Sequence, residues 1–215
     1  PQILSKYPTV SPSYEGQNRE AGKLTRSLKP VGLAVLLLIY ITIAFVFRSY
    51  SQPILLLLLI PFSLPAVAWG HWVHNFPINI LSMLGIIALI GIMVNDGLVL
   101  ISKFNTNLRE GMKFDDAIYE AGRSRFRAIF LTSLTTIAGL APLIFEKSRQ
   151  AQFLKPMAIS VAYGIGFATI LTLLMLPLFL AFSNRIKVGG KWLITGNKVT
   201  NEEVERAIKE QNEIH

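Results

Sequence analysis

One acidic residue lies deep inside a long apolar stretch of the chain, and its position suggests proton transport. Asp96 falls within residues 80–101 and is the only aspartate or glutamate in any of the chain's five long apolar segments. Ionisable side chains inside a membrane are costly, usually face other helices, and mark ion or proton pathways. The alternatives are an aspartate with a packing role, or one near the cytoplasmic rim that reaches water.

The residue before Asp96 is also polar. Adjacent residues of an α-helix point about 100° apart, so Asn95 and Asp96 cannot both face one partner squarely. An asparagine in a membrane helix either hydrogen-bonds a neighbouring helix or takes part in transport. Which of the two residues faces a proton pathway stays open at this point.

Four hydroxyl side chains lie near the start of the fourth apolar segment, at Thr132, Ser133, Thr135 and Thr136. Such hydroxyls usually hydrogen-bond their own helix backbone, but they can also pass protons or hold water beside a carboxylate. Arg125 precedes Thr132 by seven residues and shares its helix face if the helix begins early. Its guanidinium would then lie at the cytoplasmic mouth below the hydroxyls, or at the interface bound to lipid phosphate.

Small residues recur where helices can approach one another closely. Gly85 and Gly91 lie in the third apolar segment, and every fourth position in part of the last segment is small, at Ser160, Gly164 and Ala168. Stripes of this kind permit close contact between membrane helices. We predict a packing role for all five residues.

Other kinds of chemistry find little support. The chain has no cysteine, and His71 and His74 have no third ligand in view, so we predict no metal site and no cofactor. The two histidines fit a membrane interface. A Walker A motif for ATP and the His-Glu-x-x-His motif of metalloproteases are both missing from the sequence. The sequence therefore gives no sign of these two kinds of enzyme.

The elements that hold these residues follow from composition. Of 215 residues, 52% are hydrophobic and 16% are charged, against about 25% charged residues in soluble domains. A helix needs about 20 residues to cross a bilayer. We predict an all-α membrane protein with five transmembrane helices, at about residues 31–47, 53–72, 80–101, 128–145 and 157–182.

Positive charge predicts the orientation of these helices. The net charge is +8, and most of the 21 Lys and Arg residues flank the segments on the side of the C-terminus. Because cytoplasmic loops carry an excess of Lys and Arg, we place the N-terminus outside the cytoplasm and the C-terminus inside it. Basic residues beside apolar runs act as orientation signals, so we expect no nucleic-acid partner.

Three polar regions lie outside the spans. Residues 1–29 contain prolines and glycines that should break any regular element. Residues 114–124 have apolar positions at helical spacing, so we predict an amphipathic helix on the cytoplasmic surface. Residues 184–215 are predicted to form a cytoplasmic tail, with a short helix between Thr200 and Gln211.

Several motifs in combination resemble one transporter family. They lie at Gly91–Ile101, Glu110–Met112, Asp116–Ile118, Arg125–Arg127, Leu131–Leu143 and Gln152–Ala158. The stretch from about Pro1 to Arg185 is similar to the last five membrane helices of resistance–nodulation–division exporters of the hydrophobe/amphiphile type. The resemblance implies a twelve-helix membrane domain in two similar halves. This chain would carry the last five helices, and residues 1–29 would end a periplasmic porter or docking insertion.

The resemblance also implies a function and a site. Such exporters, which include multidrug pumps, are secondary transporters that exchange protons for substrate, so the resemblance implies a transporter rather than an enzyme. Asp96, Asn95, Thr132 and Arg125 match this half's share of their proton relay, although well-studied drug pumps have a lysine in place of Asn95. The expected setting is the bacterial inner membrane. The expected partners are membrane lipid, the N-terminal half of the same pump, further copies in a homotrimer, a periplasmic adaptor and an outer-membrane channel.

Two other functions fit the same sequence. A membrane assembly or anchoring subunit would use the spanning helices without transport chemistry, and Asp96 would then have no role. Related branches of the family export lipids or metal ions in place of drugs.

Overall fold

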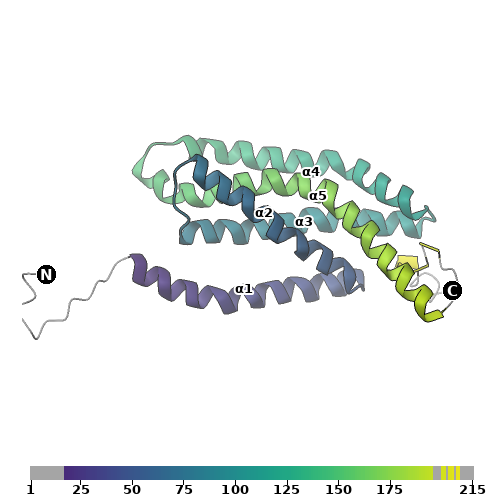
Figure 1. Ribbon diagram of the computed structural model, residues 1–215. Coiled ribbons are helices and arrows are strands. Elements are labelled where there is room, and N and C mark those ends of the chain that lie inside the picture. The colour runs from purple at the N-terminus through teal and green to yellow at the C-terminus, as the bar shows by residue number, and fades with distance from the viewer. Residues whose placement is uncertain (1–16, 196–199, 202, 206, 209–215) are drawn as a thin grey trace, which may run out of the picture. The chain divides into compact units, whose positions relative to one another are not determined.

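The computed structural model describes residues 17–195, 200–201, 203–205 and 207–208, and long helices account for nearly all of them. The helices are α1 (Gln17–Phe47), α2 (Ser51–Val73), α3 (Ile80–Arg109), α4 (Phe114–Phe145) and α5 (Arg149–Thr195) (Figure 1). These residues contain no strand, so the all-α prediction is confirmed for this part of the chain.

Four of these helices are long and apolar enough to cross a membrane: α2, α3, α4 and α5 up to Leu193. In α1 the apolar part, Gly32–Phe47, is shorter. At about 1.5 Å per residue that part falls short of the ~30 Å hydrocarbon core. Membrane helices at four of the five predicted places are therefore supported by length and composition, and a crossing at residues 31–47 stays a prediction.

The chain divides into two compact units, residues 1–37 and 38–215, with the boundary inside α1. In the first unit, the described residues are helical from Gln17 onward, although no regular element was expected before residue 30. Gly22 does not stop the helix, because one glycine costs only about 1 kcal/mol and its neighbours include strong helix formers. Residues 1–16 of the predicted periplasmic insertion lie outside the described residues.

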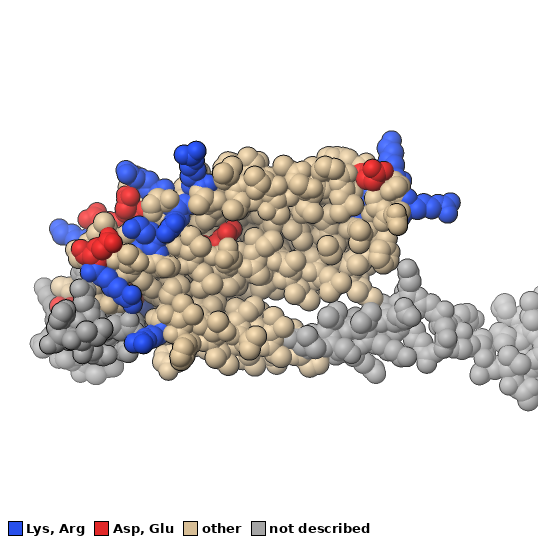
Figure 2. All heavy atoms as spheres, turned by 180° about the vertical axis from the view of Figure 1, so that it is seen from behind, with Lys and Arg blue, Asp and Glu red and all other residues tan. Residues whose placement is uncertain are grey.

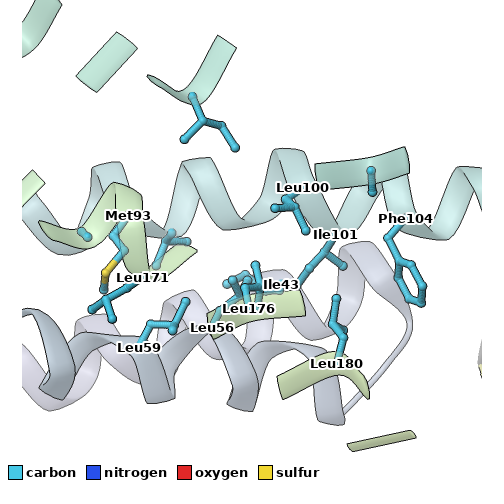
Figure 3. Packing of buried hydrophobic residues seen from close by; sticks show 14 of the residues in the cluster. Ile43, Leu56, Leu59, Met93, Leu100, Ile101, Phe104, Leu171, Leu176 and Leu180 are labelled. Carbon is cyan, nitrogen blue, oxygen red and sulfur yellow. The ribbon is translucent and has the colours of Figure 1, made fainter. Parts of the chain in front are cut away.

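In the second unit α5 is the central helix. It packs against α2, α3 and α4, while α3 also contacts α2 and α4. Close packing of apolar side chains is a main stabilising term in the core of a membrane bundle, since lipid gives little hydrophobic driving force between helices. Figure 3 shows the part of this core between α2, α3 and α5, with one residue from the last turns of α1: Ile43, Leu56, Leu59, Met93, Leu100, Ile101, Phe104, Leu171, Leu176 and Leu180.

Two helices are longer than predicted because their buried faces continue past the apolar segments. α3 runs on from residue 101 to Arg109, since Phe104 and Leu108 are fully buried. The predicted surface helix at 114–124 is the first part of α4, continuous with the span that was expected from residue 128. Ala117 and Ala121 bury against the protein core, so the apolar face of this segment is covered by protein.

Short polar contacts fix the connections on either side of α3. Asn79 and Ser82 form a capping box, in which the Asn79 side chain accepts from the Ser82 backbone N–H at 3.0 Å. At the other end Gly111 adopts φ +85°, a conformation that suits glycine. The Asn107 side-chain amide donates to the Ala117 carbonyl at 3.1 Å and ties α3 to α4.

The tail predicted from residue 184 begins as a continuation of α5, which passes through Gly189 and Gly190 to Thr195. Residues beyond it then return to α5. The Asn184 amide donates to the Asn201 carbonyl at 2.8 Å and to the Glu205 carboxylate at 3.0 Å. Val204 and Ala207 are buried as well. Of the predicted helix at 200–211, residues 207–208 are helical, and Gln211 lies outside the described residues.

Charge is unevenly distributed on the described surface. On the face shown in Figure 2, Lys, Arg, Asp and Glu side chains gather toward the two ends of the helices, and mostly uncharged surface lies between. A bilayer selects this pattern because its core contains no water to solvate a charge.

The contact between α3 and α5 generates a test with two matched glycines of α3. A Cβ at Gly85 would lie 2.7 Å from the Met157 carbonyl oxygen and 2.8 Å from Ser160 Cβ, whereas a Cβ at Gly91 would meet nothing within 4 Å. We expect Gly85→Ala to destabilise the protein by about 1–3 kcal/mol through overpacking. Gly91→Ala should be neutral or slightly stabilising. Thermal unfolding in detergent, followed by circular dichroism, measures both, and equal melting temperatures would contradict the packing role of Gly85.

Candidate functional site

Asp96 lies on the buried face of α3. It is only 8% exposed, and the nearest residues on the same face, Met93 and Leu100, are 2% and 0% exposed. The next residue, Gly97, lets α2 come close, because a Cβ there would overlap a methyl carbon of Leu56. Among the described residues the Asp96 carboxylate makes no hydrogen bond or ion pair. The carboxylate is therefore enclosed mainly by apolar side chains.

Asn95 points the other way. It is exposed, as is Gly91 one turn before it, so the two form part of an uncovered face of α3. The 100° between adjacent residues explains how one neighbour is buried and the other is not. Within this chain, Asp96 and not Asn95 faces the other helices.

Thr132 is exposed on α4, and its hydroxyl donates to its own helix, at 3.0 Å from the Ala128 carbonyl and 2.9 Å from the Ile129 carbonyl. The hydroxyl that reaches another helix is that of Ser133, which is 5% exposed and is hydrogen-bonded to Thr169 of α5. The sequence indicated Ser133 only as one of four neighbouring hydroxyls, with no separate role. Its position on the buried stripe with Ile129 was the signal that could have distinguished it.

Arg125 is half-buried on α4, and its Nε is enclosed without a hydrogen-bond partner. Because α4 is continuous from Phe114 to Phe145, Arg125 and Thr132 lie on one face of it, about 20° apart around the axis. A buried guanidinium N–H without an acceptor is unfavourable. Such a group is available to a carboxylate or a water molecule.

The four predicted relay residues therefore sit on two helices that pack together, α3 and α4. No hydrogen bond or ion pair joins Asp96 to Thr132 or Arg125 in the described part of the chain. Asp96 and Arg125 are at least partly buried, whereas Asn95 and Thr132 are exposed. The structure thus separates the predicted set into an inward-facing and an outward-facing pair.

The predicted packing residues differ in how closely side chains of other helices approach them. Gly164 faces Leu89, because a Cβ at that position would overlap a methyl carbon of the leucine. Ser160 and Ala168 are buried on α5, at 0% and 4% exposure. Gly91 has open space around it in this chain.

Polar pairs that were not predicted from the sequence cross the bundle at both ends. Gln52 of α2 and Asn105 of α3 are buried and exchange two amide hydrogen bonds, at 2.9 and 3.1 Å. His71 is 2% exposed and lies 2.9 Å from the Ser160 hydroxyl. His71 is covered by α5, and its place at a membrane interface stays a prediction. Ser160 has a polar partner besides its place in the packing stripe.

Residues 2–184 match the AcrB/AcrD/AcrF family over most of the chain. The chain belongs to this family. The resemblance to resistance–nodulation–division exporters that its motifs indicated is thereby confirmed, and the chain is part of a multi-pass efflux transporter family.

Curated relatives in this family carry different names. The cobalt-zinc-cadmium resistance protein CzcA of Cupriavidus metallidurans is 29% identical over 173 residues, which cover 80% of this chain and 16% of that protein. The multidrug resistance protein MdtC of Erwinia tasmaniensis is 26% identical over 162 residues, 75% of this chain and 16% of that protein. The swarming motility protein SwrC of Bacillus subtilis is 31% identical over 147 residues, 68% of this chain and 14% of that protein. The chain thus spans about 16% of the length of the first of these relatives.

A solved structure has the same fold. The crystal structure of a heavy metal efflux pump, in its crystal form II, superposes with a TM-score of 0.70 over 85% of this chain and 19% of that protein, at 22% identity. At this identity the likeness concerns the fold of the helices.

The amide pair between α2 and α3 generates a double-mutant test. Either Gln52→Leu or Asn105→Leu alone leaves a buried amide without its partner, which should cost about 1–3 kcal/mol. The double variant leaves neither amide, so we expect it to be more stable than the sum of the single changes predicts. Unfolding in detergent measures the coupling, and additive effects would show that the two side chains are not partners.

Proposed function

We propose that this chain supplies part of the proton-relay membrane domain of a proton-driven exporter in the bacterial inner membrane, with Asp96 as its proton-binding residue. The observation that carries the proposal is the burial of Asp96 in line with Met93 and Leu100 on α3. Membership of the AcrB/AcrD/AcrF family supports it independently.

The charge of the Asp96 carboxyl group determines how stable its buried position is. A neutral carboxylic acid is tolerated among apolar side chains, whereas the carboxylate requires a positive charge, hydrogen-bond donors or water. Binding and release of a proton therefore change which arrangement of α3 and its neighbours is more stable. Each charge moved across the membrane potential contributes about 2.3 kcal/mol per 100 mV, which is enough to shift such an equilibrium.

Arg125 and Thr132 would stabilise Asp96 when its carboxyl group is deprotonated. The enclosed Nε of Arg125 lacks an acceptor, and a rotation or shift of α4 against α3 would bring this cation toward the carboxylate. Thr132 shares its face and offers a hydroxyl that, apart from bonds to its own helix, is exposed. In this mechanism, deprotonation of Asp96 favours the state in which α4 has approached.

Asn95 would belong to a different contact. It lies with Gly91 on the uncovered face of α3, where a polar side chain beside a small residue suits close contact with a further membrane helix. We assign this face to the N-terminal half of the same transporter. The chain would then provide the last five of twelve helices, with its N-terminus in the periplasm and its C-terminus in the cytoplasm.

The exporter as a whole would be a homotrimer that works with a periplasmic adaptor and an outer-membrane channel. Its cargo would be chosen outside these helices. The matched segment is similar to relatives named for metal resistance and for multidrug resistance alike. A shared energy-coupling part with different cargo accounts for this breadth.

The decisive variant is Asp96→Asn in the complete transporter. It keeps the size of the side chain but cannot bind and release a proton, so we expect resistance and dye efflux to fall to background while expression and membrane insertion stay normal. Asp115→Asn, which changes an exposed carboxylate in the first turn of α4, should leave transport unchanged. Efflux that survives Asp96→Asn would instead support a membrane anchor without transport chemistry.

Variants of two adjacent residues, Thr132 and Ser133, distinguish a role in the proton relay from a role in helix packing. Thr132→Ala removes an exposed hydroxyl, so it should slow proton-coupled efflux while the melting temperature stays constant. Ser133→Ala breaks the buried hydrogen bond to Thr169 and should destabilise the protein by about 1 kcal/mol with less effect on coupling. Efflux assays with thermal unfolding give both readouts, and the reverse pattern would place the relay at Ser133.

A further inference from the structure

The hydroxyl of Thr172 on α5 is buried and has no partner in the described part of the chain. Thr172 is 1% exposed, and its Oγ1 is enclosed without a hydrogen bond. Other buried hydroxyls of the bundle behave differently, since those of Ser133 and Thr169 donate to the backbone carbonyl four residues before them. A buried polar group that is left unpaired in a native structure calls for a physical explanation.

The helices α3 and α5 pack side by side in a constant register. A Cβ at Gly85 would lie 2.8 Å from the Cβ of Ser160, and a Cβ at Gly164 would overlap a methyl carbon of Leu89. In both contacts the α5 residue comes 75 positions after its α3 neighbour. The two helices therefore run in the same direction along this contact.

This register places Thr172 at the depth of Asp96. The same offset of 75 positions leads from Asp96 to the α5 residue directly before Thr172. At about 1.5 Å per residue, the two side chains lie within one turn of each other along the helices. Further on, a methyl carbon of Leu176 lies 3.7 Å from the position of a Cβ at Gly97, so α5 still faces α3 at this depth.

The neighbours of Thr172 on α5 show where its side chain points. Thr169, three residues earlier, is hydrogen-bonded to Ser133 of α4, and Leu176, four residues later, approaches α3. Residues three and four positions apart share one side of a helix. The Thr172 hydroxyl is therefore directed to the region between α3 and α4.

Asp96 lies on the corresponding side of α3. Leu89, seven residues earlier, packs against α5, and Asn107, eleven residues later, donates to the Ala117 carbonyl of α4. Both residues are within about 20° of Asp96 around the axis of α3. The Asp96 carboxyl group and the Thr172 hydroxyl thus enter the same region from two helices.

Few charged groups share this region. No Asp, Glu, Lys, Arg or His occurs at positions 51–70 of α2 or 156–184 of α5. On α4, the contact between Asn107 and Ala117 places Arg125 within about one turn of the depth of Asp96. The hydroxyl of Thr172 is thus the neutral hydrogen-bonding group, and the guanidinium of Arg125 the charged one, that other helices bring to this depth.

We propose that Thr172 is a positioning residue for Asp96, and that its hydroxyl donates a hydrogen bond to the Asp96 carboxyl group through one water molecule or after a small rotation of either side chain. The hydroxyl keeps its own proton. It donates to a carboxylate oxygen when Asp96 is charged and to the carbonyl oxygen when Asp96 is protonated. The proposal rests on the proposed proton-binding role of Asp96, and it adds α5, which contacts α2, α3 and α4, to the helices that respond to the proton.

The test is infrared difference spectroscopy of the complete transporter in lipid, recorded between high and low pH. A protonated carboxyl group absorbs through its C=O stretch, and the band of Asp96 is the one that Asp96→Asn removes. Thr172→Val keeps the shape of the side chain without the donor, so the Asp96 band should move to higher frequency. Proton-driven efflux should slow about tenfold, as expected for the loss of a hydrogen bond to a charged group. Thr172→Ser keeps a hydroxyl and should retain both the band position and the rate.

Thr169→Val is the matched control, because it makes the same change three residues away and breaks the bond to Ser133. It should lower the melting temperature and leave the Asp96 band in place. Should Thr172→Val fail to fold, Thr172→Ala removes the same donor. An Asp96 band that the Thr172 variant leaves unmoved, or that Thr169→Val or Thr172→Ser moves equally, overturns the proposal and leaves the proposed function intact. If Asp96→Asn removes no band, the proton-binding role of Asp96 is itself contradicted.

Discussion

The carboxyl group of Asp96, enclosed by apolar helices, is the constraint on which the rest of the second unit depends. An isolated carboxylate in a medium of low dielectric constant carries a large desolvation penalty. The surrounding helices therefore need to accommodate a neutral acid while leaving a route to a cation or to water. Gly97 and the fully buried Leu100 bring the α2 and α5 side chains close around α3 at this level. In the mechanism that we propose, the complement to this carboxylate is Arg125 of α4, which has a buried donor that lacks an acceptor.

Polar pairs keep the helices in register around this group. Three pairs join two helices each: Gln52 with Asn105, Ser133 with Thr169, and His71 with Ser160, whose residues are 53, 36 and 89 positions apart in the sequence. Because lipid is as apolar as the helix surfaces, hydrogen bonds and close packing, more than hydrophobic burial, hold membrane helices together. A bundle held by a few directional contacts can change its arrangement when one charge changes, which suits an energy-coupling domain.

Much of the fold was predictable from the sequence. Five long apolar segments predicted a helical membrane protein, and the motifs around Asp96 and Thr132 were enough to indicate the family. Helix ends were less predictable. Phe104, Leu108 and Ala117 look like parts of a polar loop, because their burial depends on partners from other helices. The same reason explains why the return of the chain from Asn201 to Ala207 onto α5 could not be foreseen.

What the sequence alone determined was the type of each element and the presence of one acidic residue in an apolar span, since both follow from hydrophobicity along the chain. Tertiary structure decided which polar side chains meet. In the folded chain Asp96 is buried and Asn95 is exposed. Ser133, and not Thr132, is hydrogen-bonded to α5, and His71 lies against the Ser160 hydroxyl. Periodicity gives the angle between two side chains on one helix, but only packing against other helices determines which face is turned inward.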